Sequence, residues 1–364
     1  MINIKEKINS NALSSLVPSL VKAAFFGYGI SAIFISSKTS SLLSLIIGFI
    51  ISLIYIFIFL KVYSYKEELT MLEKIDYLFP KVISIPLTFI ILITIFFLSL
   101  LIYYLINYFV VSHYLTETPF WLIGIILISS VFYLSTKNYE VLTRVSSILT
   151  IVSIVMILVN IFGLLPYSKV NNILPLYNFN NSKIIKSSLI FFSLFSSPLF
   201  LITFINKKQI IDSDKVNKKI IIHVILSFIV TFIIFYMILS TLGINLIEIF
   251  SYPEYIALKK INLNFAKSIE NICFLVWSIF AYILCTTGVM YLRDSIKDTF
   301  KLKSDNINMI IPFFICLFII LIPELLFKDN HILTGYIYGV APVILGSILC
   351  GSVILIFPLT KLKK

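Results

Sequence analysis

The chain has 364 residues, of which 59% are hydrophobic and 13% are charged, and its mean hydropathy is +1.04. This composition excludes a soluble globular protein. The formal net charge of +12 would suit nucleic-acid binding. The positions of the basic residues, described below, give them another role, and no nucleic-acid partner is predicted.

Apolar segments long enough to cross a bilayer follow one another along the chain, since each crossing needs roughly 20 helical residues. About ten are expected, near 13–36, 40–61, 82–112, 119–136, 143–165, 186–206, 219–243, 267–292, 308–327 and 335–358. Barrel strands are excluded because the segments are too long and do not alternate. The sequence therefore predicts an all-α integral membrane protein with a single transmembrane domain over residues 1–364.

The basic residues lie mainly on one side of this topology. With a cytoplasmic N-terminus, 20 of the 29 Lys and Arg residues fall in cytoplasmic segments and eight fall in outer loops. This is the positive-inside bias of a polytopic membrane protein, and it predicts that both termini and the loop Lys207–Lys219 are cytoplasmic. The remaining one, Lys22, lies within the first span. It is either a functional intramembrane cation or a side chain near the cytoplasmic interface.

Two spans carry signals that interrupt a helix. Span six contains Ser196-Ser197-Pro198, where the proline removes one helical hydrogen bond and the serines offer hydroxyls to the freed backbone. Span one contains Gly27-Tyr28-Gly29, and its two glycines weaken the helix. Irregular backbone at membrane depth persists only where protein or a wet cavity shields it. The alternative is that the glycines serve packing and the proline makes a structural kink.

The two interrupted spans occupy corresponding positions in two sets of five. The sets run from about 13 to 165 and from about 186 to 358, joined by the linker Pro166–Lys186. Because five is odd, the second set enters the membrane from the opposite face, so a repeat must be inverted. Interrupted segments at matching positions mark the binding site of many transporters. The pattern predicts a five-plus-five inverted repeat with broken helices one and six and a small ligand, such as a zwitterion, at the breaks.

The predicted site has a core and side walls. Three polar side chains within apolar spans could close its sides, although hydrogen bonds between helices would explain the two on span three, Tyr103 and Asn107, equally well. The predicted ligand-binding residues are Gly27, Tyr28, Gly29, Ser196, Ser197 and Pro198 at the breaks, with Tyr103, Asn107 and Thr286 as side walls. At the outer end of span eight, Lys267 and Glu270 form a possible charge pair, or each faces headgroups and water separately.

Other kinds of chemistry lack support in the sequence. The four cysteines all fall inside spans, without a CxxC motif or an adjacent histidine, and are expected to be small core residues. No paired aspartates, HExxH motif or Ser/His pair at a usable spacing is present. We therefore expect no catalytic residues, no metal, no cofactor and no enzymatic activity. Two short amphipathic helices are predicted, one within Tyr63–Pro80 and an outer surface helix that begins at Pro253.

Two stretches carry a resemblance to a known family. Tyr252-Pro253-Glu254-Tyr255-Ile256-Ala257-Leu258, followed by Phe265, Ile269-Glu270 and Trp277, resembles the spore germination B-subunit permeases. Thr118-Pro119, followed by Glu140 and Leu142-Thr143-Arg144, is similar to the link into that family's fifth span. The resemblance runs over nearly the whole chain. The chain departs from the pattern at Ser268, where an arginine is expected, and Lys267 precedes it.

The resemblance implies a fold and a function. The family belongs to the amino acid–polyamine–organocation transporter superfamily, whose LeuT-like fold is the inverted repeat predicted above. The implied protein is a membrane subunit of a spore germinant receptor in the inner membrane of the spore, which binds a small nutrient such as an amino acid and triggers germination. Its implied partners are an A subunit and a C-subunit lipoprotein, in addition to membrane lipid. The alternative is a secondary active amino acid transporter, which would share the same fold and site.

Overall fold

The computed structural model describes residues 7–25, 29–178, 180–261, 268–302, 304, 306–326 and 341–362. Its helices are α1 (Ser10–Ser14), α2 (Leu16–Lys22), α3 (Ile30–Ser37), α4 (Ser41–Tyr63), α5 (Met71–Leu78), α6 (Lys81–His113), α7 (Phe120–Ser135), α8 (Tyr139–Leu164), α9 (Asn181–Ser196), α10 (Ser213–Leu242), α11 (Ile244–Ile247), α12 (Pro253–Leu258), α13 (Glu270–Thr299), α14 (Ile307–Leu326) and α16 (Ala341–Leu362). Short 3₁₀ segments are η2 (Lys38–Ser40), η3 (Leu165–Tyr167), η4 (Val170–Ile173), η5 (Ser197–Phe204) and η6 (Lys207–Gln209). The described strands are β1 (Ile8–Asn9) and β2 (Ile210–Ile211).

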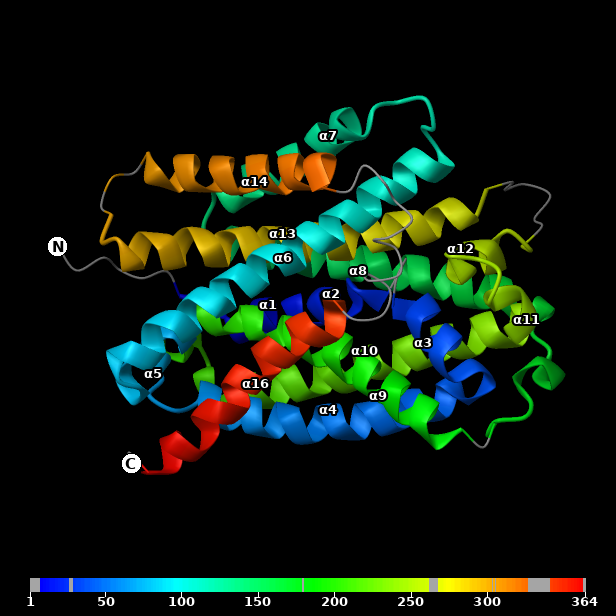
Figure 1. The fold of residues 1–364 in the computed structure, drawn as a ribbon, viewed down its shortest axis with the longest axis horizontal. Helices are drawn as coiled ribbons and strands as arrows, with labels where there is room; N and C mark the ends of the chain where they lie inside the picture. The colour runs from blue at the N-terminus through cyan, green and yellow to red at the C-terminus, as the bar shows by residue number, and fades with distance from the viewer. Residues whose placement is uncertain are drawn as a thin grey trace.

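The long helices are the membrane spans. In the described part of the chain, eight helical stretches are long and apolar enough to cross a bilayer. The expected ten segments correspond to α1–α3, α4, α6, α7, α8, α9 with η5, α10, α13, α14 and α16. The two numbers differ because α7 has only 16 residues, span one is interrupted, and α3 runs into α4 through η2. Figure 1 shows the long helices lying side by side, with α5 at one end of the bundle and α11 and α12 at the other.

Contacts at the end of the bundle that carries α5 bring together segments predicted to be cytoplasmic. β1 pairs in parallel with β2, so the N-terminal strand lies against the loop that follows span six. Lys207 Nζ in that loop contacts Glu67 Oε1 at 2.6 Å, which joins it to the segment between α4 and α6. Arg293 near the end of α13 donates to the carbonyl of Ser135 at 2.6 Å. The relative arrangement of these segments therefore follows the predicted topology.

The opposite end of the bundle gathers loops predicted to be external. Lys38 Nζ contacts Glu248 Oε1 at 2.9 Å, which joins the turn after span one to the segment after span seven. Asn178, which precedes α9, donates through Nδ2 to the carbonyl of Ser37 at 2.9 Å. Ser31 donates to the carbonyl of Ser251 at 2.6 Å. Two sets of loops thus lie at opposite ends of the spans.

Span six is the central element of the bundle. Of its most apolar stretch 83% is buried inside the protein, against 67% for α13 and 22% for the peripheral α8. α9 packs closely against α4, where Gly48 allows the approach: a Cβ atom there would lie 2.7 Å from the Ser188 carbonyl oxygen. The Ser188 hydroxyl donates to the Ile184 carbonyl of its own helix at 2.8 Å, so this buried hydroxyl needs no partner on another span.

Two short helices lie outside the spans. α5 is capped by reciprocal hydrogen bonds between Thr70 and Glu73, and the Lys74 amine donates to the carbonyls of Val62 and Tyr63 at 3.1 and 2.8 Å. These bonds satisfy carbonyls at the end of α4. Burial lowers the pKa of Lys74 to about 8. The predicted amphipathic helix between spans two and three is therefore confirmed as α5.

α12 begins at Pro253 as predicted, but its placement on the surface is wrong. Tyr252, Pro253 and Tyr255 are buried. The ring of Phe109 on α6 lies 4.8 Å from the Tyr252 ring and 5.3 Å from the Tyr255 ring, both edge-on. The aromatic residues that gave the segment its amphipathic pattern therefore face neighbouring helices instead of the membrane interface.

Candidate functional site

The regular α-helix of span one ends before its two glycines. α2 ends at Lys22 and α3 begins at Ile30. The amide of Gly29 donates to the carbonyl of Ala24, five residues earlier, at 3.0 Å, which is the wider spacing of a π turn. A Cβ atom at Gly29 would lie 2.8 Å from Cδ1 of Leu194, so the backbone of span one passes close to span six. Gly27 and Tyr28 lie outside the described residues.

Span six changes its winding at the predicted position. α9 ends at Ser196, and the chain continues as the 3₁₀ segment η5 from Ser197, with Pro198 in its first turn. Proline cannot donate the amide bond that would continue the α-helix, which accounts for the change. Ser196, Ser197 and Pro198 are all buried. The hydroxyl of Ser196 has no hydrogen-bond partner among the described residues.

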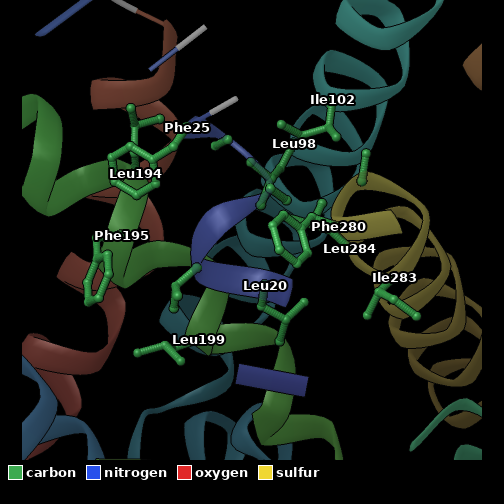
Figure 2. Close-up of a cluster of buried hydrophobic side chains, with 14 of the residues drawn as sticks. Leu20, Phe25, Leu98, Ile102, Leu194, Phe195, Leu199, Phe280, Ile283 and Leu284 are labelled. Carbon is green, nitrogen blue, oxygen red and sulfur yellow. The ribbon is translucent and has the colours of Figure 1, made fainter. Parts of the chain in front are cut away.

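The two interrupted spans lie against each other. The ring of Phe25 on span one lies 5.2 Å from the ring of Phe191 and 6.1 Å from the ring of Phe195 on span six. Figure 2 shows how apolar side chains from four spans converge beside the interruptions. They are Leu20 and Phe25 from span one, Leu98 and Ile102 from span three, Leu194, Phe195 and Leu199 from span six, and Phe280, Ile283 and Leu284 from span eight. Apolar side chains from four spans therefore lie beside the interruptions.

The three predicted side-wall residues are all buried. The hydroxyls of Thr286 on α13 and of Tyr103 on α6 have no hydrogen-bond partner among the described residues. Tyr103 and Asn107 on α6 also contact span four. A Cβ atom at Gly124 of α7 would clash with the Tyr103 hydroxyl, and Asn107 Nδ2 donates to the Phe120 carbonyl at 3.0 Å. Asn107 therefore makes the hydrogen bond between helices that was the alternative to a place beside the ligand.

A cavity of about 700 Å³ lies between α1, α2, α8 and α10, toward the end of the bundle that carries β1. Lys22 lines this cavity and is buried, and its amine lies 4.6 Å from the centre of the Phe280 ring. Sequence reasoning named Lys22 but missed the other lining residues. A signal was present on α8, where polar residues recur at helical spacing over Thr143, Ser147 and Thr150.

Of the charge pair predicted at the outer end of span eight, the structure describes only Glu270. Lys267 lies outside the described residues, so its pairing with Glu270 stays a prediction. Glu270 is the first residue of α13. The next residue, Asn271, accepts a hydrogen bond through Oδ1 from the Tyr114 hydroxyl at 2.7 Å. This contact joins the end of span three to the start of α13.

This arrangement of two interrupted spans inside a helical bundle is the fold of a class of secondary transporters. A nucleobase-cation-symport-1 family transporter, solved in a closed conformation with bromovinylhydantoin bound, matches with a TM-score of 0.62 at 12% identity, over 92% of this chain and 75% of that one. A Na⁺-coupled sialic acid symporter in a substrate-bound outward-open state matches with a TM-score of 0.64 at 11% identity, over 95% of this chain and 78% of that one. The predicted fold class is thereby confirmed.

The family of the chain follows from its sequence. A profile of the spore germination protein family, the spore permeases, matches residues 15–326. The chain belongs to this family, as its motifs around Pro253 and Glu140 predicted. No curated protein sequence matches it significantly. The protein is thus an integral membrane protein of the spore permease family with a transporter fold.

Proposed function

We propose that this protein is the membrane subunit of a spore germinant receptor that binds a small nutrient, such as an amino acid, between spans one and six. The observation that carries the proposal is membership of the spore germination protein family over residues 15–326. The two interruptions, which lie side by side, supply backbone groups and the buried Ser196 hydroxyl for a ligand. An A subunit and a C-subunit lipoprotein would act beside it. The two repeats would run over about 13–165 and 186–358.

Ligand binding at the interruptions predicts an effect of removing single oxygen atoms. Ser196→Ala and Thr286→Val each delete a buried hydroxyl that has no partner among the described residues. Such a deletion is nearly neutral for stability, because no intramolecular hydrogen bond is lost. A hydrogen bond to a charged ligand group contributes about 1.5–3 kcal/mol, so the nutrient concentration for a half-maximal response should rise roughly tenfold or more. The measurement is the loss of optical density of spores after nutrient addition.

The matched control is Ser188→Ala on the same helix as Ser196. Its hydroxyl is also buried but already donates to the Ile184 carbonyl, so it is not available to a ligand. This variant should respond to nutrient like the parent. If Ser196→Ala and Thr286→Val both keep the parent's nutrient dependence at equal protein abundance, the ligand does not bind at the interruptions.

We further propose that the end of the bundle with β1, β2 and α5 faces the cytoplasm, on the positive-inside distribution of charge. A cysteine introduced at Ser213, at the start of α10, should then react with a membrane-impermeant maleimide in inside-out vesicles only. The four native cysteines are buried and would be replaced first. Labelling of this cysteine from outside intact cells would reverse the proposed orientation.

A secondary active amino acid transporter is the second candidate, and the fold it shares with two symporters favours it. Proteoliposomes distinguish the two. A transporter accumulates a radiolabelled amino acid against its gradient when a proton or sodium gradient is imposed. A receptor subunit binds the same amino acid without accumulating it. The Ser196→Ala variant should weaken binding in either case, because both functions use the same site.

A further inference from the structure

We propose that the cavity between α1, α2, α8 and α10 is a second binding site, for a small carboxylate with a short apolar body, and that the Lys22 amine is its anchor. The cavity is distinct from the packed space between spans one, three, six and eight. Its ligand is independent of the nutrient proposed above, since the two sites have different lining residues.

The first argument is that the buried Lys22 amine has no carboxylate partner among the described residues. Its side chain is 2% exposed, yet no carboxylate or hydrogen-bond acceptor among the described residues contacts its amine. The face of the Phe280 ring at 4.6 Å is its described partner, and a ring quadrupole compensates only part of the cost of burying a cation. An intramembrane cation of this kind requires an anion or water from the cavity that it lines.

The second argument is the charge balance of the lining. Lys7, Arg144 and His223 line the same cavity as Lys22. Glu140 is the acidic residue among them, and it is already paired with Arg144 on its own helix. The cavity therefore carries a net positive charge even with His223 neutral. A low-dielectric pocket of one sign concentrates ions of the opposite sign.

The third argument is the division of the lining into polar and apolar parts. The hydroxyls of Ser15 and Ser147 bond each other at 2.7 Å and join α1 to α8 along the polar part. The Ser227 hydroxyl is buried in the same lining and has no partner among the described residues. Ile151 and Leu226 form apolar walls. This combination fits a carboxylate carried by a short aliphatic body better than a fully hydrated inorganic anion.

Ser227→Cys provides the test. A cysteine side chain is similar in size to the serine that it replaces, and the rate at which its thiol is modified measures access to the cavity. Purified full-length Ser227→Cys protein, with its four native cysteines replaced, is treated with a negative and a positive methanethiosulfonate reagent. After correction for their rates with a free thiol, the negative reagent should react about tenfold faster. Lys22→Met should reduce this ratio at least threefold, whereas Lys22→Arg should retain it.

The occupant is tested first in the Ser227→Cys protein with Lys22 unchanged. At constant ionic strength, sodium propionate should slow modification of the cysteine at 227, and propylammonium should not. Lys22→Met should remove this protection. Equal protection by inorganic phosphate would overturn the assignment of a carboxylate with an apolar body. An unreactive cysteine, a charge ratio unaffected by Lys22→Met, or equal effects of propionate and propylammonium would overturn the site itself.

Discussion

Arg293→Met should lower the midpoint of thermal unfolding far more than removal of an exposed charge such as Arg144. Arg293 is buried near the end of α13, where Nη1 donates to the carbonyls of Ser135 and Lys137 at 2.6 and 2.9 Å. Its guanidinium also bonds both carboxylate oxygens of Asp294, at 2.6 and 2.7 Å. The substitution removes all four bonds and leaves a partly buried carboxylate unpaired. Breaking such a buried pair costs roughly 3–5 kcal/mol.

The matched control for this variant is Arg144→Met. Arg144 also pairs with a neighbouring carboxylate, Glu140, but its side chain is 73% exposed. An exposed pair at this helical spacing contributes about 0.3–0.5 kcal/mol, so the control should unfold close to the parent. The melting midpoint of each purified protein is measured by size-exclusion chromatography of samples heated to increasing temperatures. Equal midpoints for the two variants would show that Arg293 does not hold spans four and eight together.

Gly48→Leu should separate α4 from span six and reduce the amount of folded protein in the membrane. A Cβ atom at this position would lie 2.7 Å from the Ser188 carbonyl oxygen and 2.8 Å from Cδ1 of Phe191. The first of these is a backbone atom of a buried helix and cannot move aside alone. Overpacking of a core costs about 1–3 kcal/mol, and a leucine adds three more carbon atoms beyond the clash.

Gly351 offers a control of identical chemistry. It lies in α16, and a Cβ atom there would meet nothing within 4 Å. Gly351→Leu should therefore stay within about 0.5 kcal/mol of the parent. Both variants are compared by fluorescence-detected chromatography of detergent extracts. Gly48→Leu at parental abundance and melting midpoint would show that α4 and α9 can separate without cost.

The features predictable from the sequence are those set by local chemistry. The spans follow from apolar length, and the change of winding at Ser197 follows from the missing amide of Pro198. The capped helix α5 follows from Thr70 and Glu73 at the spacing of a capping box. Each of these signals lies within a few residues along the chain.

The features that could not be predicted depend on how helices rotate and pack. Tyr103 and Asn107 both contact α7, and their place beside a ligand stays a prediction, because an apolar span presents no periodic pattern that fixes its rotation. The helix at Pro253 was expected on the surface, and Phe109 from a distant span buries it. The cavity at Lys22 requires α1, α8 and α10 together, which are far apart in sequence.

The pairing of β1 with β2 has a mechanical consequence for the two interrupted spans. β1 leads without a linker into α1, whose first turn is capped by Asn9, and β2 follows directly on η6 after span six. The same loop is tied to span two, since the Tyr63 hydroxyl donates to the Ile205 carbonyl at 2.8 Å. The ends of spans one and six on the β1 side of the bundle are thus joined to each other and to span two. A tilt of either end must move the other with it or break a ladder two residues long, so the pairing couples the two interrupted spans.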